Sequence, residues 1–167
     1  LNIKIMFLLF TAMLAVSTSP IIARYLDNVP AVAISFWRMG FGALILWMIS
    51  VVKKQPPLSS ENRNKTIMAG IFLGIHFALF FGAIKLTTIA NATFLGTLAP
   101  LFTFFIEKFF LKRKHQTILL LGLGLAITGA MIIVGNQFDF SSDFTLGNLL
   151  AIACSLFLGM AFILSEK

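Results

Sequence analysis

The sequence predicts an all-α fold, a polytopic bundle of transmembrane helices. Two observations predict it. Of the 167 residues, 59% are hydrophobic and only 11% are charged, whereas a soluble domain carries about 25% charged residues. Apolar runs of the length that crosses a bilayer core, roughly 20 residues, also recur along the whole chain. Because lipid offers no hydrogen-bond partners to the backbone, each run is expected to be a helix.

Six spans follow from these runs. They cover residues 3–23, 31–52, 67–85, 90–111, 117–135 and 146–165. The first run follows a lysine and ends in small residues, which is also the pattern of a secretory signal. It is long for the apolar core of a signal, and a signal does not explain the five later runs. We therefore expect it to be the first span.

The net charge of +7 could indicate a nucleic-acid partner, but its distribution indicates membrane topology instead. Most of the basic side chains belong to Lys4, residues 53–65 and residues 112–115. Because each span carries the chain to the other side of the membrane, these three segments lie on the same side. Basic residues mark the cytoplasmic side. We therefore expect a multi-pass protein of the cell membrane (an inner or plasma membrane) with a cytoplasmic N-terminus and no nucleic-acid partner.

Small residues recur at four-residue spacing in the third and sixth spans, which keeps them on one helix face. The glycines among them are Gly70, Gly74, Gly82, Gly147 and Gly159. Helices in lipid associate through such faces, since small residues let the backbones approach. We expect these glycines to pack helices together. The alternative is that some of these faces slide during transport.

A polar stripe runs along the fourth span. Thr93, Thr97, Pro100, Thr103 and Glu107 follow one another at steps of three or four. Pro100 removes one backbone donor and leaves a carbonyl partly free. The stripe is typical of the wall of a hydrated cavity. The alternative is that the threonines bond to carbonyls of their own helix.

Arg38, His76 and Glu107 are ionisable residues inside the predicted spans. At the rise of an α-helix, Arg38 lies about 10 Å and Glu107 about 25 Å from the outside, and His76 lies about 15 Å into the third span, close to the midplane. Arg38 and Glu107 are thus too far apart to pair directly. Arg38 shares a face with small residues, so it points toward other helices, in either a functional or a structural role. His76 could shuttle protons or bind a ligand, or it could be a neutral packing residue.

Three stretches together resemble one known family. They are ISFWRMGFGALILW at 34–47, ALFFGAIKLTTIANATFLGTLAPLFTFFIEKFFLKRK at 78–114, and LGLAITGAMIIVG with the later GNLLAIACSLFLGMAFILSEK. The chain resembles the drug/metabolite transporter (DMT) superfamily in its EamA-type repeat. One feature departs from the family pattern: Lys112 and Arg113 stand where family members carry an acid. Glu107 is not a residue-for-residue match for that acid, so its role is not carried over.

The resemblance implies ten helices in two inverted repeats of five. Residues 1–135 would form the first repeat, and residues 136–167 an outer loop and the first helix of a second, truncated repeat. The missing second repeat would then come from the same longer chain or from a second copy. The implied function is secondary transport of small organic metabolites or drugs by alternating access, with export as the expected direction.

The same resemblance implies site roles. Arg38 would orient an anionic group or lock the outer half; as a general feature of the family, it should not decide which substrate is chosen. Substrate-path candidates are Arg38, His76, Thr93, Thr97 and Pro100, and Glu107 is a candidate for proton coupling.

We expect no enzyme, no catalytic residue, no metal and no cofactor. The chain has a single cysteine, Cys154, and two histidines, His76 and His115. An intramembrane enzyme needs a clustered nucleophile and base or a metal set, and neither HExxH nor GxSxG occurs. The remaining alternative to a transporter is a non-transporting scaffold, assembly subunit or half-size fragment.

Overall fold

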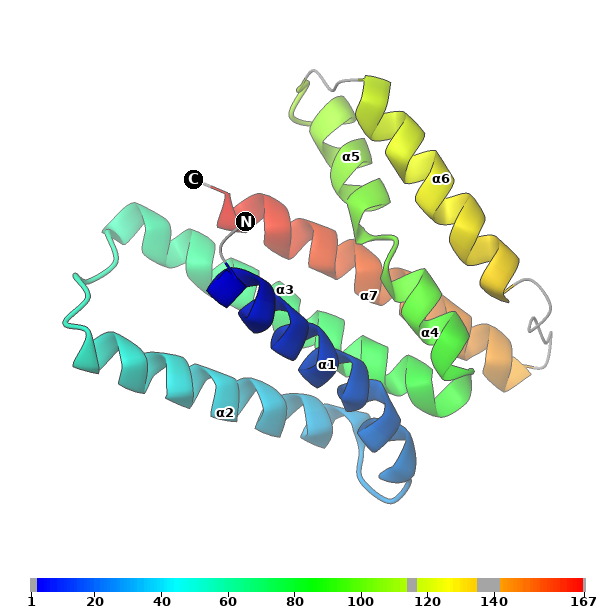
Figure 1. Cartoon of the computed structure of the whole chain (residues 1–167), viewed down its shortest axis with the longest axis horizontal. Coiled ribbons are helices and arrows are strands. Elements are labelled where there is room, and N and C mark those ends of the chain that lie inside the picture. Colours follow the sequence, from blue (N-terminus) through cyan, green and yellow to red (C-terminus); the bar gives the residue numbers. More distant parts are fainter. Residues whose placement is uncertain (1–2, 114–116, 135–141, 167) are drawn as a thin grey trace.

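The computed structural model confirms the all-α prediction. It describes residues 3–113, 117–134 and 142–166, and within these ranges every regular element is a helix. In chain order they are α1 (Ile3–Tyr25), α2 (Ala31–Val52), α3 (Ser60–Leu86), α4 (Ile89–Gly96), α5 (Ala99–Phe109), α6 (Thr117–Val134) and α7 (Ser142–Ser165) (Figure 1). Two predicted loop regions, residues 114–115 with His115 and residues 135–141, lie outside the described residues.

Five segments of the described chain are long and apolar enough to cross a membrane. They are α1, α2, most of α3, α4 together with α5, and most of α7. The fifth predicted span corresponds to α6, which contains the shorter apolar stretch Leu120–Gly129. The polytopic architecture is therefore that of the prediction, with α4 and α5 sharing one span.

The predicted fourth span, residues 90–111, is confirmed as an apolar segment long enough to cross a membrane, Ile89–Phe109, and it is interrupted near Pro100. Helix α4 ends at Gly96 and α5 begins at Ala99. Pro100 has no N–H, so the carbonyl of Gly96 loses its helical donor. The N–H of Leu101 bonds to the carbonyl of Leu98 instead, at 2.9 Å. The chain thus turns between two half-helices.

Helix α3 begins seven residues before the predicted start at residue 67. The Ser59 side chain accepts a hydrogen bond from the backbone N–H of Asn62 and caps the helix, which satisfies a backbone donor at the first turn. The residues between Ser60 and Thr66 are polar, so they carry no signal for a bilayer span. The helix therefore extends beyond its apolar segment.

Helices α3 and α7 form an antiparallel pair that runs the length of both. At one end Gly147 lies against Thr87, in the middle His76 contacts Cys154, and further along Phe72 packs against Phe157. Figure 1 shows the two helices side by side. Helices α4 and α5 also contact α7, so α7 is covered along most of one side.

The buried core lies where α1, α3, α4 and α7 meet. Its members are all apolar: Ala23, Phe81, Ala83, Ile84, Ala92, Phe94, Leu95 and Ala151. Four of these eight are alanines, which lets the helix backbones approach closely. The core is therefore compact and sits toward the end of the bundle where α1 is linked to α2.

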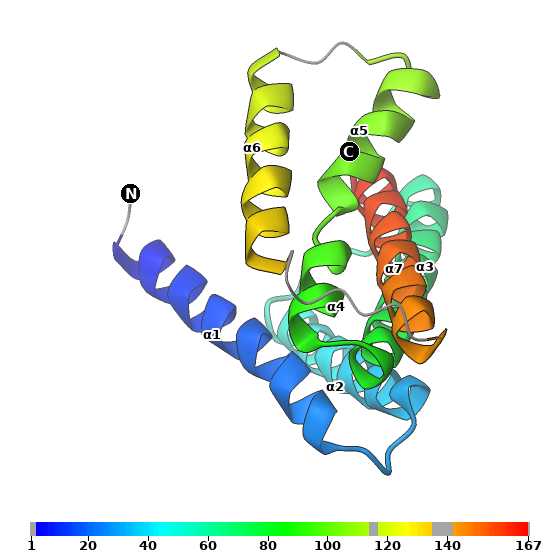
Figure 2. The same cartoon turned by 90° about the vertical axis from the view of Figure 1, so that its right-hand side faces the viewer.

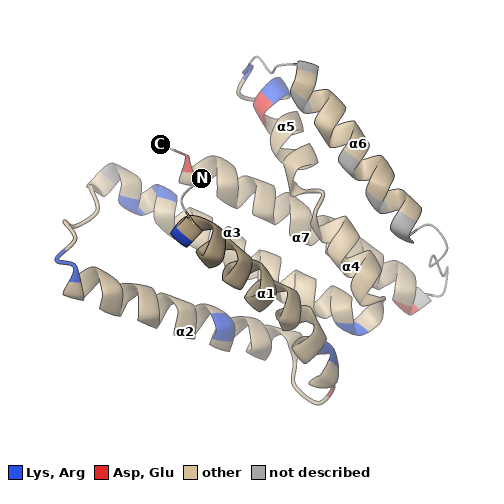
Figure 3. Cartoon of the chain, in the orientation of Figure 1, with Lys and Arg blue, Asp and Glu red and all other residues tan. Residues whose placement is uncertain are grey.

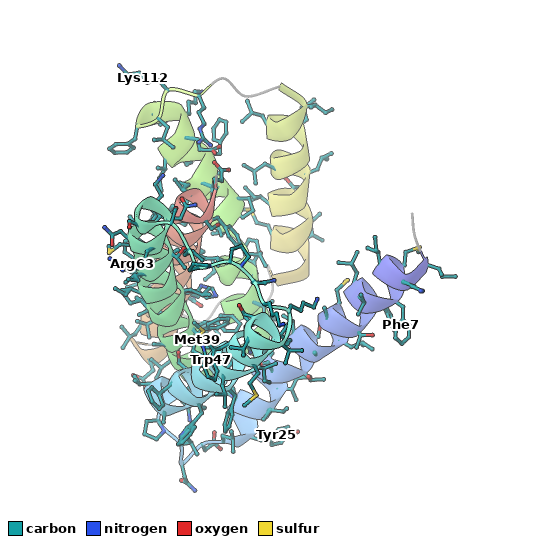
Figure 4. The ribbon with its side chains drawn as sticks, turned by 90° about the vertical axis from the view of Figure 1, so that its left-hand side faces the viewer. Phe7, Tyr25, Met39, Trp47, Arg63 and Lys112 are labelled. Carbon is teal, nitrogen blue, oxygen red and sulfur yellow. The ribbon has the colours of Figure 1, made fainter. Side chains whose placement is uncertain are left out.

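The outward surface of the bundle is apolar. Phe7, Tyr25 and Trp47 project away from their helices and are more than half exposed (Figure 4). Figure 2 shows α1 leaning away from the α3–α7 pair and α6 standing to one side. Exposed apolar area on this scale marks a surface that contacts lipid or other protein rather than water.

Charged residues gather at the helix ends, and a single basic position, Arg38, interrupts α2 (Figure 3). Two lysines at helix ends, Lys54 and Lys112, have positive φ angles of 47° and 52°. After α2 the N–H of Gln55 bonds to the carbonyl of Ser50, and that of Lys54 to Val51. This is the pattern of a Schellman cap, here with lysine where glycine is usual.

The close approach of Gly147 predicts a marked effect of substitution. A Cβ at residue 147 would lie 2.8 Å from the backbone nitrogen of Thr87, whereas one at Gly70 would meet no atom within 4 Å. We expect Gly147→Ala to lower the free energy of unfolding by about 1–3 kcal/mol, because backbone cannot move aside cheaply. Gly70→Ala should be neutral or raise it by up to about 1 kcal/mol. Thermal unfolding in detergent checks this, and equal shifts for the two variants would contradict it.

Candidate functional site

Arg38 links three helices. From α2 its guanidinium donates a hydrogen bond to the hydroxyl oxygen of Ser19 on α1. The same group lies over two rings of α3, 4.5 Å from the centre of Phe77 and 5.8 Å from that of Phe81. A guanidinium over an aromatic face is attracted by the ring quadrupole. Arg38 therefore joins α1 and α3 to α2 within the apolar part of the bundle.

His76 joins α3 to α7. Its Nδ1 lies 2.8 Å from the carbonyl oxygen of Cys154. Because a carbonyl only accepts hydrogen bonds, Nδ1 carries the proton, and Nε2 is the acceptor of the neutral ring. The ring is buried, edge-on to Phe77 and stacked on Phe80. The Nδ1 nitrogen thus joins the two helices.

Arg38 and His76 both contact the ring of Phe77. The guanidinium is 4.5 Å from the centre of that ring and the imidazole centre is 4.9 Å from it. The sequence placed the two side chains in neighbouring spans at similar depth without showing that they share a neighbour. The structure brings these two candidates together around one aromatic side chain.

Thr93, Thr97 and Pro100 are exposed, on either side of the junction between α4 and α5. The hydroxyl of Thr97 donates to the carbonyl of Phe94 at 2.7 Å, and that of Thr103 to Ala99 at 2.9 Å. These two hydroxyls therefore bond to their own helices and keep their lone pairs as acceptors. No hydrogen bond within the described ranges joins this stripe to Arg38 or His76.

A cluster around Thr87 fastens the end of the bundle where α1 meets α2. Arg24 donates to the carbonyls of Ile84 and Thr87, the latter at 3.2 Å. Cations are favourable at helix C-termini, where carbonyls lack partners. The Thr87 hydroxyl donates to Asn148 of α7 at 2.9 Å. This Thr87 cluster joins the ends of α1 and α3 to the start of α7.

Lys85 fixes the short link between α1 and α2. Its ammonium donates to the carbonyls of Leu26 and Asp27 at 2.7 and 3.2 Å. The N–H of Val29 bonds to Leu26 within the same turn. The link is thus held to the end of α3 by a side chain as well as by its own backbone.

The opposite end carries an ion-pair cluster centred on Arg113. Its guanidinium contacts Glu107 at 2.7 Å and also pairs with Glu166 beyond α7. Lys112 is in the left-handed conformation, and the N–H of Arg113 then bonds to the carbonyl of Glu107 at 3.0 Å. Hydrogen bonding to Glu166 and to Glu107 raises the pKa of Arg113. Arg113 therefore stays charged and links the end of α5 to the end of α7.

The predicted packing glycines differ in their surroundings. A Cβ at Gly159 would lie 3.2 Å from the Thr103 hydroxyl oxygen, and one at Gly82 would be in ordinary contact with Leu150. A Cβ at Gly70 or Gly74 would have no atom within 4 Å. Gly74 still approaches α2, since its carbonyl accepts from the Ser35 hydroxyl at 3.3 Å. A packing role for Gly70 and Gly74 stays a prediction.

Sequence reasoning missed Arg24, Lys85 and Arg113 as structural groups. Arg24 and Lys85 are basic residues on the side of the topology that otherwise carries acids, and that exception was the available signal. For Arg113 the signal was its position where the family carries an acid. Within the described ranges no three His, Cys, Asp or Glu side chains gather in a way that could hold a metal ion.

The chain matches the EamA-like transporter family over residues 3–135. It belongs to this family. The match confirms the resemblance drawn from the arginine-containing second span and the run through Pro100. As an EamA-like protein with several apolar helices, it is a multi-pass membrane protein of a transporter family.

One curated relative is the mouse protein "Solute carrier family 35 member G1". It is 26% identical over 128 residues, which are 76% of this chain and 35% of the relative. The chain thus spans about a third of the length of that relative. No solved structure matches the chain.

The two acids of the Arg113 cluster should contribute unequally. The side chain of Glu107 is 12% exposed and that of Glu166 is 47% exposed. Exposed pairs are screened by water and salt. We expect Glu107→Gln to lower the unfolding temperature more than Glu166→Gln does. Raising the salt from about 0.05 to about 0.5 M should remove the Glu166 effect first. A larger loss from Glu166→Gln would contradict this ranking.

Proposed function

We propose that this EamA-like chain is part of a secondary transporter that exports small organic molecules by alternating access. The family supports transport as the class of function. Within the structure, the proposal is carried by the break in the fourth span. Discontinuous helices in transporters expose backbone carbonyls to a substrate or coupling ion, and irregular backbone is tolerated in a membrane where it lines a cavity.

The path that we propose follows this break. Thr93, Thr97 and Pro100 are exposed at the junction of α4 and α5, and the carbonyl of Gly96 lacks its helical donor because of Pro100. The threonines offer hydroxyl oxygens at this exposed surface, whereas Gly96 itself is buried in α4. Such a surface can accept hydrogen bonds from a polar substrate while its apolar parts contact lipid or the second repeat.

Arg38 and His76 would act beside this path. Arg38 holds α1, α2 and α3 together, which suits a group that locks one half of the transporter. His76 contacts α7, the helix that we assign to the second repeat, so movement between the repeats would break its bond to Cys154. We therefore propose that both side chains respond to the conformational change, and that His76 Nε2 faces the substrate in one state.

Glu107 is the proposed coupling group. Its carboxylate pairs with Arg113 at 2.7 Å and is mostly shielded. Protonation of an acid in such a pair removes its attraction for the guanidinium. Proton binding to Glu107 would thereby weaken the contact between α5 and α7 that Arg113 maintains through Glu166. This is how a proton gradient could drive the conformational change.

Substitution of Arg38 tests the proposed role. We expect Arg38→Gln to reduce transport at least about tenfold, since the intramembrane charge and its bond to Ser19 are lost. Arg38→Lys should retain part of the activity, because lysine keeps the charge without the planar fork. The assay is uptake or efflux in proteoliposomes across a broad panel of organic solutes, with Trp47→Phe as control. Normal transport and folding of Arg38→Gln would refute this role, and absence of any transport would favour the scaffold alternative.

The topology can be tested through the single cysteine. Cys154 is the single cysteine of this sequence, so the Cys154→Ala variant of it carries no thiol. In this background Asn28→Cys lies in the link after α1, and Lys54→Cys lies in the turn after α2. With a cytoplasmic N-terminus, a membrane-impermeant maleimide should label residue 28 in intact cells and label residue 54 only after lysis. The reverse pattern would invert the proposed orientation.

A further inference from the structure

A groove of about 290 Å³ lies between α1 and the α2–α3 pair. Its walls are mostly apolar, and the polar groups in them are two hydroxyls and one guanidinium. The lining side chains that matter below are Ala15, Val16, Thr18, Ser19, Arg38 and Phe81. We call this space the Arg38 groove. Its volume is at the lower end of the range for small-molecule sites, about 300–1,000 Å³.

The charge of Arg38 has no acidic partner within the described residues. Its guanidinium contacts the Ser19 hydroxyl and the rings of Phe77 and Phe81. A guanidinium has five N–H donors. Removing such a charge from water costs several kcal/mol unless it is paired. The groove is therefore complementary to an anion.

With α1 crossing the bilayer, we expect the groove to lie below the headgroup level. Ser19 precedes the end of α1 at Tyr25 by six residues, which is about 9 Å along the helix. Val16 and Ile22 flank the groove and are more than half exposed on the surface of α1. Helix α1 makes its main contacts with α3 and α4 rather than α2. A molecule dissolved in the bilayer can thus reach Arg38 between α1 and α2.

We infer that the Arg38 groove binds a single-chain amphipathic carboxylate, such as a fatty acid, taken from the bilayer. The carboxylate accepts from the unused N–H groups of Arg38, for which the planar fork is well matched. The Ser19 oxygen accepts from Arg38, so its own hydrogen can donate to the same carboxylate. The apolar chain then lies along Ala15, Val16 and Phe81.

A diacyl phospholipid fits this groove less well. A volume of about 290 Å³ accommodates one slender chain better than two. The Thr18 hydroxyl donates to the carbonyl of Ala15 at 3.0 Å, so it offers an acceptor to a ligand rather than a donor.

The proposed binding site is independent of the proposed transport function: it can bind the carboxylate whether or not the protein moves the bound molecule.

Spin-labelled stearate tests the inference directly. The full chain is placed in phosphatidylcholine nanodiscs with stearate labelled near its methyl end, and the motionally restricted fraction is measured by electron paramagnetic resonance. The methyl ester of the same acid is the uncharged control ligand. We expect stearate to associate about tenfold more strongly than the ester, as one hydrogen bond to a charged group predicts. Arg38→Gln should remove this excess, and Arg38→Lys should keep part of it.

A second variant tests the groove with Arg38 in place. Ala15→Phe fills the groove and should also remove the excess, whereas Ala12→Phe, three residues away on α1 and outside the lining, should not. Equal restriction of stearate and its ester on the unchanged chain would overturn the inference. Stronger association of stearate than of its ester in both Arg38→Gln and Ala15→Phe would also overturn it. So would the finding that spin-labelled phosphatidic acid, and not stearate, is the ligand that associates more strongly than the ester.

Discussion

Along its whole length α3 packs against α7, from the approach of Gly147 to the Thr87 amide, through the bond of His76 to Cys154, to the rings of Phe72 and Phe157. Lipid tails are as apolar as leucine, so burial from water cannot hold two helices together in a bilayer, and close packing and interhelical hydrogen bonds must do so. Both are present here. Helices α4 and α5 then rest on α7, and the Thr87 cluster can form because the start of α7 reaches the end of α3.

The sequence predicted the spans well because their signal is local: an apolar run of sufficient length specifies a helix in lipid whatever surrounds it. The sequence-based prediction was less accurate where the structure does not depend on an apolar run. Pro100 predicted an interrupted hydrogen-bond ladder in the fourth span, but a proline inside a membrane helix is often tolerated, so the sequence did not predict that α4 and α5 are two separate helices. The polar turns after Ser60 are helical through a cap rather than through apolar character.

The contacts of the site residues were harder to predict than their positions in the spans. Depth and helix face follow from residue number, and they placed Arg38 and His76 near the same level. The acceptor of His76 is a backbone carbonyl 78 positions away, and every residue has such a carbonyl. Spacing likewise predicted the glycine faces without showing what covers them: Gly147 and Gly159 lie against the end of α3 and α5, whereas a Cβ added at Gly70 would meet no atom within 4 Å. Tertiary contacts decide which carbonyl His76 binds and which glycines are covered, and such contacts cannot be read from a single sequence.

Arg38 shows why a structural and a ligand-binding role need not exclude each other. Cation–π contacts contribute about 0.5–2 kcal/mol each, and one hydrogen bond to a charged group about 1.5–3 kcal/mol. Their sum is comparable with, or smaller than, the several kcal/mol that desolvating the charge costs. The contacts to Ser19, Phe77 and Phe81 therefore fix the guanidinium between three helices without saturating it. A charge that is held in position and only partly compensated is prepared to bind an anion.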